Sequence, residues 1–216
     1  MALNIDIISD VVCPWCYIGK RRIETALELY AQQNPAAEKP SVTWRPFQLN
    51  PDMPAVGMSR QDYVTQKFGA SRARDIYSRV TGVGAEVGIA FAFDKIARQP
   101  NTLAAHSLID LAGSTGLQDQ VEEALMHAYF VDGIDLTKIE NLVAIASSAG
   151  LDQAAVRKCL ADPQSRQKVE EEDQRARAIG VQGVPFFIFN GKVAVSGAQE
   201  PAALLDAMRQ AQAATA

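Results

Sequence analysis

Two cysteines that enclose a proline and a tryptophan are the residues of this chain best suited to chemistry. Cys13 and Cys16 bracket Pro14 and Trp15. One thiolate can attack a disulfide, and a second thiol three residues later can displace the mixed disulfide that results. The other common use of such a pair is half of a tetrahedral zinc site, which needs two further ligands. The chain has only Cys159 and two histidines to offer, without a second pair at ligand spacing. The pattern therefore favours redox chemistry and predicts no metal.

The context of the pair predicts which thiol is the nucleophile. Residues 4–9 are rich in isoleucine and predict a buried strand, and an amphipathic helix follows the cysteines. Cys13 then lies at a helix N-terminus, where unpaired N–H groups and the helix dipole favour an anion. We expect its pKa to fall below the free value of about 8.5. Cys16, one turn further in, is expected to be less exposed and to resolve the mixed disulfide.

Neighbouring residues shape this predicted site. Pro14 suits the first helical turn, where its missing N–H costs nothing. Trp15 adds apolar surface but no charge, which predicts a mild oxidant. The basic residues at 20–22 are expected to form a solvated helix face, as is the acidic run at 170–173.

A second candidate feature is Val184-Pro185, directly before the aromatic run that begins at Phe186. A proline that opens a strand can simply protect a sheet edge. It can also be a cis-proline, which would leave the backbone of Val184 available to an extended substrate. Because only about 5% of X–Pro bonds are cis, spacing alone favours the trans form.

Strands and helices are both predicted around these residues. Strands are predicted at 4–9 and 41–49, with Pro46 placing the second at a sheet edge, and helices fill most of 59–180. A strand at 184–189, an Asn-Gly hairpin turn, a return strand at 192–196 and a last helix that frays after Arg209 complete the chain. The pattern predicts an α/β fold with a mixed four-stranded sheet, whose first two strands are parallel through a right-handed crossover.

Composition excludes several classes of protein. The chain has 216 residues, a net charge of −4 and three cysteines, which argues against a structural disulfide framework and predicts no nucleic-acid partner. No apolar run approaches the 18–20 or so residues that span a bilayer, so no membrane partner is expected. The first residues lack a basic segment followed by an apolar one, which predicts a cytoplasmic protein with reduced cysteines at rest.

Four stretches together resemble the FrnE-type branch of the DsbA family. They are DVVCPWCYIGK at 10–20, QPNT at 99–102 with His106, GVP at 183–185 and SGAQ at 196–199. The resemblance covers almost the whole chain. It implies a thioredoxin-like domain made of residues 1–58 and 165–216, interrupted by an all-helical insertion at 59–164. It also implies that Pro185 is cis and lies beside Cys13.

The resemblance further implies a thiol–disulfide oxidoreductase or isomerase. Its catalytic residues would be Cys13, Cys16 and Pro185, and its substrate-binding residues would be Val184, Asn101 and Phe186. The partners would be disulfide-containing peptides, proteins or small thiols. No bound cofactor is expected, with glutathione as a candidate redox partner and a homodimer left open. Cys159 is expected to be a core residue, and His106 a satisfied core or surface histidine rather than one that lines the cleft.

Related families leave two other functions open. Kappa-class glutathione transferases and 2-hydroxychromene-2-carboxylate isomerases resemble this chain too, but they carry serine where Cys13 stands. A glutathione-dependent isomerase or transferase would keep its activity on a non-disulfide substrate after Cys13→Ser. A redox-independent chaperone or binding module would act without either cysteine.

Overall fold

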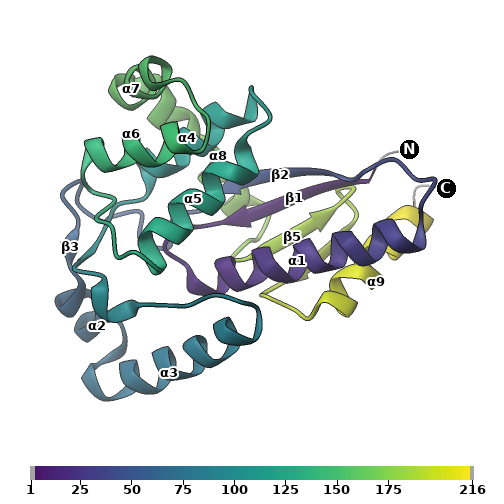
Figure 1. Ribbon diagram of the computed structural model, residues 1–216, viewed down its shortest axis with the longest axis horizontal. Coiled ribbons are helices and arrows are strands. Elements are labelled where there is room, and N and C mark those ends of the chain that lie inside the picture. The colour runs from purple at the N-terminus through teal and green to yellow at the C-terminus, as the bar shows by residue number, and fades with distance from the viewer. Residues whose placement is uncertain (1–2, 215–216) are drawn as a thin grey trace.

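A four-stranded sheet forms the centre of the molecule in the computed structural model (Figure 1), which describes residues 3–214 apart from the side chains of 70 and 71. The strands lie in the order β2 (Ser41–Pro46), β1 (Asn4–Ser9), β5 (Phe186–Phe189) and β6 (Val193–Ser196). β1 pairs with β2 in parallel and with β5 antiparallel, and β5 pairs antiparallel with β6. The predicted mixed sheet and its edge strand at Pro46 are confirmed.

The alternation of side chains along β1 and β5 creates two apolar layers. Ile7 lies opposite Phe187, and both belong to the main core. Ile8 lies opposite Phe186, and both pack into a smaller cluster on the other face of the sheet. Successive residues of a strand point to opposite faces, so a sheet covered on both faces needs apolar residues at successive positions, as at Ile7 and Ile8 of β1 and throughout β5.

Helices cover both faces of the sheet. α1 (Pro14–Gln33) and α9 (Pro201–Ala213) pack together on one face, and α8 (Pro163–Ala178) covers the other. The remaining helices lie between β2 and β5 in the chain and are grouped at the end of the sheet away from the termini (Figure 1). They are α2 (Arg60–Phe68), α3 (Ala70–Glu86), α4 (Leu103–Gly113), α5 (Gln118–Phe130), α6 (Ile139–Ser148) and α7 (Gln153–Ala161).

Two local predictions are confirmed by backbone geometry. The hairpin turn has positive φ angles at Asn190 (52°) and Gly191 (65°), as a type I′ turn requires. The Val184–Pro185 peptide bond is cis, as the resemblance implies.

Other predictions need correction. β2 ends at Pro46 rather than at residue 49, and β5 begins only after the cis-proline. The last helix does not fray after Arg209, because Ala211 is buried and the helix continues to Ala213. The helical segment also holds a two-stranded sheet of β3 (Met58–Ser59) and β4 (Arg98–Gln99), with a short 3-10 helix, η1 (Phe93–Lys95), just before β4.

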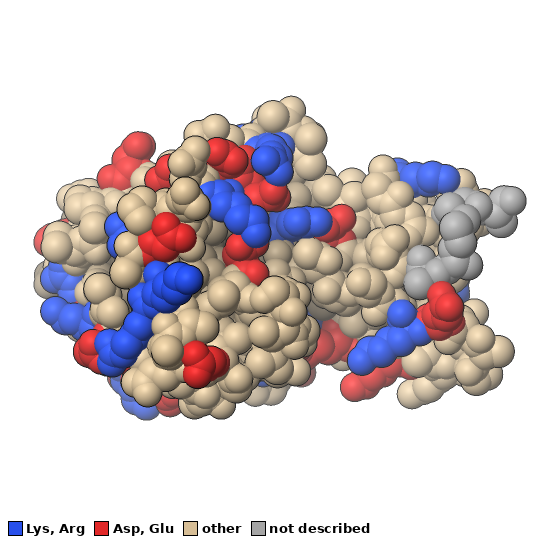
Figure 2. Space-filling view, turned by 90° about the horizontal axis from the view of Figure 1, so that it is seen from above, with Lys and Arg blue, Asp and Glu red and all other residues tan. Residues whose placement is uncertain are grey.

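The surface shows no concentration of one charge on the face in Figure 2, where basic and acidic side chains are interspersed. Within residues 3–214, no helix is both long and apolar enough to cross a membrane.

Candidate active site

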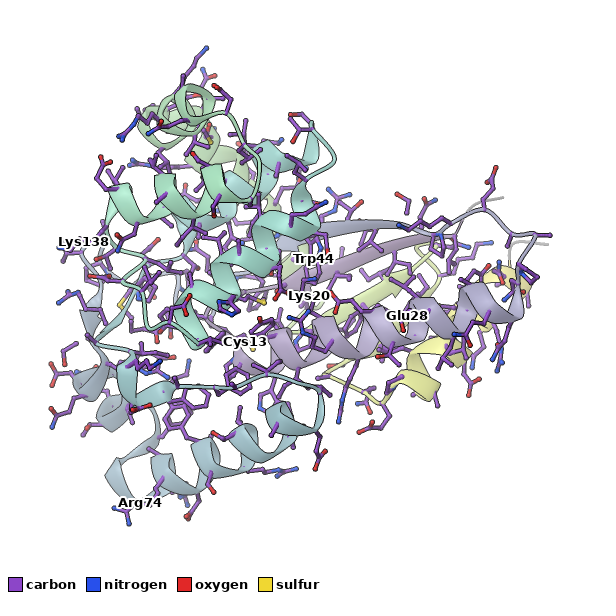
Figure 3. All side chains as sticks on the ribbon, in the orientation of Figure 1. Cys13, Lys20, Glu28, Trp44, Arg74 and Lys138 are labelled. Atoms are coloured by element: carbon purple, nitrogen blue, oxygen red, sulfur yellow. The ribbon has the colours of Figure 1, made fainter. Side chains whose placement is uncertain are left out.

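Cys13 occupies the N-cap of α1, the position that the sequence predicts. Its backbone N–H donates to the carbonyl of Asp10 at 2.9 Å, which closes the turn between β1 and α1. Its own carbonyl accepts from the N–H groups of Cys16 and Tyr17 at 3.0 and 3.3 Å. Pro14 stands at the start of the helix, where no hydrogen bond is lost. Figure 3 shows Cys13 at the end of α1 that points into the helical part of the molecule.

The cis-proline segment lies directly against the nucleophile. The Cys13 thiol donates to the carbonyl oxygen of Val184, with 3.5 Å between Sγ and O. Among the described residues, the Val184 N–H has no hydrogen-bond acceptor. This approach depends on Gly19, because a Cβ there would lie 2.8 Å from Cγ of Pro185. Gly19 falls within the motif at 10–20 but was not predicted to be part of the site.

Cys16 lies behind Cys13 and is 1% exposed. Burial is the main reason that the pKa of its thiol is raised above the usual value, and the neighbouring Cys13 thiol raises it further. The Asp10 backbone and the Ser9 hydroxyl act in the opposite direction by hydrogen bonding. All three cysteines of the chain are free thiols, so the structure represents the dithiol form.

The other predicted site residues have contacts of different kinds. Trp15 is half-buried against the main core. The Asn101 side chain donates to the carbonyl of Met53 at 2.8 Å and accepts from the N–H of Leu103 at 2.9 Å, so both of its polar ends serve loop structure. Phe186 packs on the α8 face of the sheet. Substrate-binding roles for Asn101 and Phe186 stay predictions.

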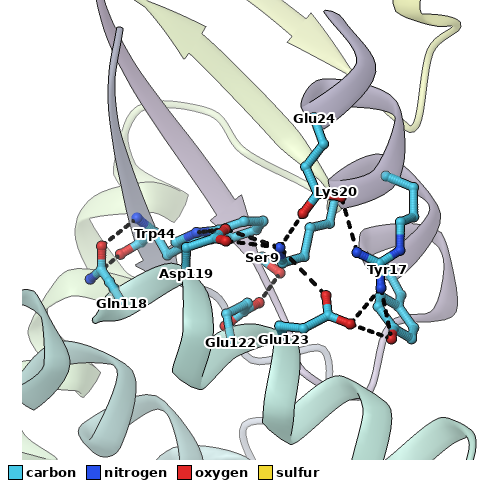
Figure 4. Close-up of polar contacts among 10 residues, drawn as sticks. Ser9, Tyr17, Lys20, Glu24, Trp44, Gln118, Asp119, Glu122 and Glu123 are labelled. Atoms are coloured by element: carbon cyan, nitrogen blue, oxygen red, sulfur yellow. Dashed lines mark hydrogen bonds and ion pairs between the residues drawn. The ribbon is translucent and has the colours of Figure 1, made fainter. Parts of the chain in front are cut away.

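The expectation of a solvated basic face on α1 is wrong for Arg22, which is buried, and most clearly for Lys20. Its side chain is 2% exposed, and its ammonium group lies among three carboxylates, as Figure 4 shows. These belong to Glu24, Asp119 at 3.0 Å and Glu123 at 3.4 Å. The carboxylates outweigh the effect of burial and raise the pKa of Lys20. A charged cluster thus joins α1 to α5. The acidic run at 170–173 is likewise not wholly solvated, since Asp173 is buried and accepts from the N–H of Gln48.

A second polar group lies beside Cys16 and was also missed. The Ser9 hydroxyl donates to Oε1 of Glu122 at 2.8 Å, and both residues are 1% exposed. Burial raises the pKa of Glu122 to about 7. His106, which was predicted to be a core or surface histidine, is buried, with Nε2 3.4 Å from the carboxylate of Asp10. Burial lowers the pKa of His106, but Asp10 and the other nearby carboxylates outweigh it and raise the value.

A glutamate on the apolar face of α5 is the signal that could have revealed this group. Val121, Leu125 and Met126 are fully buried around Glu122. A fully buried carboxyl is rare unless it has a partner or a function. Across residues 3–214, no group of three or more His, Cys, Asp or Glu side chains is arranged to hold a metal ion.

Comparisons with known proteins agree with this geometry. A probable DsbA oxidoreductase from Streptomyces coelicolor is similar in structure, with a TM-score of 0.87 and 30% identity over 98% of this chain and 90% of that one. A 2-hydroxychromene-2-carboxylate isomerase superposes with a TM-score of 0.68 and 17% identity over 96% and 95% of the two chains. The cytosolic disulfide reductase DsbM from Pseudomonas aeruginosa, in its structure with GSH, superposes with a TM-score of 0.61. The sequence identity is 16% over 97% of this chain and 96% of that one. The family model of the DsbA-like thioredoxin domain matches residues 4–209. With a thiol at the start of α1 facing a cis-proline, and with this match over nearly its full length, the chain belongs to the DsbA-like thioredoxin domain family.

Proposed function

We propose that this protein is a thiol–disulfide oxidoreductase or isomerase that exchanges disulfides through Cys13 and Cys16. The observation that carries the proposal is the contact between the Cys13 thiol and the Val184 carbonyl, directly before the cis bond to Pro185. This contact places the Cys13 thiol, at the N-terminus of α1, next to backbone groups that can form hydrogen bonds with an extended peptide. Helix N-termini favour the thiolate, which is the reactive form.

The reaction follows from the order of the two sulfur atoms. The Cys13 thiolate attacks one sulfur of a substrate disulfide, and the other sulfur leaves as a thiolate that takes up a proton. Cys16 then loses its proton and attacks Sγ of Cys13. The bond between Cys13 and the substrate breaks, so the substrate gains two electrons and the enzyme keeps a Cys13–Cys16 disulfide. The reverse sequence oxidises a substrate dithiol.

The substrate class follows from the groups beside Cys13. The unused N–H of Val184 can donate to the backbone of an extended chain, which favours a peptide or protein disulfide over a compact small molecule. Trp15 offers apolar surface but no charge. Disulfide-containing peptides and proteins are therefore the proposed substrates.

We propose a cytoplasmic location and glutathione as the thiol that restores the dithiol form. The absence of a membrane-spanning helix within the described residues is compatible with this location. DsbM, whose fold this chain shares, is a cytosolic disulfide reductase, and its structure was solved with GSH. In a reducing compartment, thiols such as glutathione keep dithiols reduced.

Insulin reduction by dithiothreitol tests the proposal, with turbidity of the released chain as the readout. The wild-type protein is expected to speed the reaction, and Cys13→Ser is expected to abolish the acceleration. Cys16→Ser is expected to trap mixed disulfides. Equal rates for the wild-type and Cys13→Ser proteins would show that Cys13 is not the nucleophile. Cys159→Ser is the matched control. The buried Cys159 thiol donates a hydrogen bond to the carbonyl of Ser107, and we expect it to be dispensable for insulin reduction.

A further inference from the structure

We propose that the outer edge of β2 and the groove beside it bind an extended peptide that carries lysine or arginine. The groove has a volume of about 760 Å³ and lies between α1 and β2, with the start of α5 also lining it. Figure 3 labels Glu28 on α1 and Trp44 on β2, which both line the groove. Glu28 lies 15 residues along α1 from Cys13, which is about 22 Å at 1.5 Å per residue. The proposal is therefore independent of the disulfide exchange at Cys13.

The backbone of β2 has one edge that β1 does not use. The N–H of Ser41 donates to the carbonyl of Leu3 at 2.8 Å, so Ser41 is a residue whose backbone faces β1. In a parallel pair the hydrogen-bonding groups of successive residues point to alternate sides of the strand. The N–H and C=O groups of Val42 and Trp44, one and three residues later, therefore point away from β1.

A side chain of α5 closes this edge at Trp44 but not at Val42. The Gln118 amide accepts from the Trp44 N–H at 2.8 Å and donates to the Trp44 carbonyl at 3.1 Å, as a neighbouring strand would. Among the described residues, no side chain makes these two bonds to Val42. The start of β2 also extends beyond the group of helices (Figure 1). The edge at Val42 is therefore open to one residue of an added strand.

The peptide residue that pairs with Val42 would place its side chain in the groove. Val42 itself lines the groove, and directly opposed residues of paired strands lie on the same face of a sheet. Much of the lining is apolar and includes Ile7, Ile23, Leu27, Val42 and Trp44. A long side chain with an apolar stem can pack on such a surface.

The charges around the groove favour a side chain with a positive end. The charged residues among its described lining are Glu24, Glu28, Glu38, Asp119 and Lys39. Lys20 already pairs with Glu24 and Asp119. Glu28 and Glu38 are exposed and have no ion pair among the described residues. Lysine and arginine combine an apolar stem with a positive end, so they match both the lining and these two carboxylates.

A second copy of this chain matches the groove less well. The chain has a net charge of −4. A two-fold contact through this face would place the same acidic residues of both copies against each other. Like charges that meet across an interface oppose association. The extended basic peptide is therefore the proposed occupant.

A short peptide without cysteine, which alternates lysine with threonine and carries fluorescein, tests the proposal by fluorescence anisotropy at low ionic strength. It should bind, and its counterpart with glutamate in place of lysine should not. Methylation of the backbone nitrogens of its lysines should abolish binding, because the N–H that would donate to the Val42 carbonyl is removed. When the parent peptide binds, the amide proton of Val42 should exchange with deuterium more slowly.

The double variant Glu28→Gln/Glu38→Gln removes both unpaired carboxylates. It should weaken binding of the lysine peptide about fivefold, as expected for two exposed ion pairs. The matched control is Asp75→Asn/Glu170→Gln, which makes the same change in net charge on α3 and α8 and should bind as the wild type does. Unchanged thermal unfolding of both double variants would show that they are folded.

Equal weakening in the two double variants would overturn the proposal, because binding would then depend on net charge alone. A lysine peptide that does not bind would also overturn it. Added-strand pairing would be refuted by a backbone-methylated peptide that binds as tightly as its parent, or by a Val42 amide whose exchange is unchanged. A dimer in sedimentation that the peptide converts to monomers would assign the groove to a second copy instead.

Discussion

Replacing Glu122 by glutamine should change the free energy of unfolding in a way that depends on pH. Burial moves the pKa of this carboxyl from 4.5 to about 7, which corresponds to about 3 kcal/mol. Because the folded value is raised, the folded state holds the proton more tightly than the unfolded state. The stability from this group is complete below pH 4.5 and is lost as pH rises to 7 and beyond. Glutamine does not titrate, so the variant should gain about 3 kcal/mol relative to the wild type between pH 4.5 and pH 8.

Urea unfolding at several pH values, followed by circular dichroism, measures this difference. Glu123→Gln provides a control of opposite sign. Although burial raises its pKa, the hydrogen bond from Tyr17 and the charges of Lys20 and Arg21 outweigh burial and lower it. The stability that the Glu123 carboxylate contributes is present above the unfolded pKa and is lost as pH falls. Glu123→Gln should therefore lose stability relative to the wild type as pH rises. If the stability difference between Glu122→Gln and the wild type were constant with pH, the carboxyl would not be perturbed and the reasoning would be wrong.

Substitutions at Gly19 and Lys20 test the packing around the site, with a substitution at Gly82 as the control for Gly19. Gly19→Ala should destabilise the protein by about 1–3 kcal/mol and slow insulin reduction, because the new Cβ would lie 2.8 Å from the cis-proline ring. Gly82→Ala, which meets open space in α3, should instead stabilise it by about 0.5–1 kcal/mol in the same urea titration. Equal effects of the two alanines would contradict the close approach. Lys20→Met should cost about 3 kcal/mol in thermal or urea unfolding, because three carboxylates lose their shared cation. A variant as stable as the wild type would show that the cluster is not needed.

The sheet could be predicted because its signals are local. The isoleucine run of β1, the aromatic run of β5 and the Asn-Gly turn each belong to one element, and the structure places them as predicted. The position of Cys13 at the start of α1 follows from the same kind of signal, namely a strand that ends just before a cysteine, a proline and an amphipathic helix. The cis bond at Pro185 could not be derived from spacing, because its cause is the surrounding structure, and it followed from the resemblance alone.

The buried charges could not be predicted because their partners are distant in the chain. Lys20 falls in a basic run that is typical of a solvated helix face, yet it meets Asp119 and Glu123 from α5. Ser9 and Glu122 are separated by 113 positions, and nothing near either residue indicates the other. The contacts of Asn101 were not predicted either, since its amide holds a loop through Met53 and Leu103, while its role in substrate binding stays a prediction.

The central claim is that Cys13 makes first contact with the substrate sulfur. Oxidised glutathione, mixed with the reduced Cys16→Ser protein and quenched with acid, would leave a glutathione adduct that peptide mass spectrometry can locate. The adduct should lie on Cys13 at the start of α1, and on Cys159 only after unfolding, because burial raises the pKa of the Cys159 thiol, which donates to the carbonyl of Ser107. An adduct on Cys159 of the Cys16→Ser protein, with Cys13 unmodified, would contradict this assignment of the nucleophile. It would also be contradicted if the reciprocal Cys13→Ser protein formed an adduct on Cys16 as fast as Cys16→Ser forms one on Cys13.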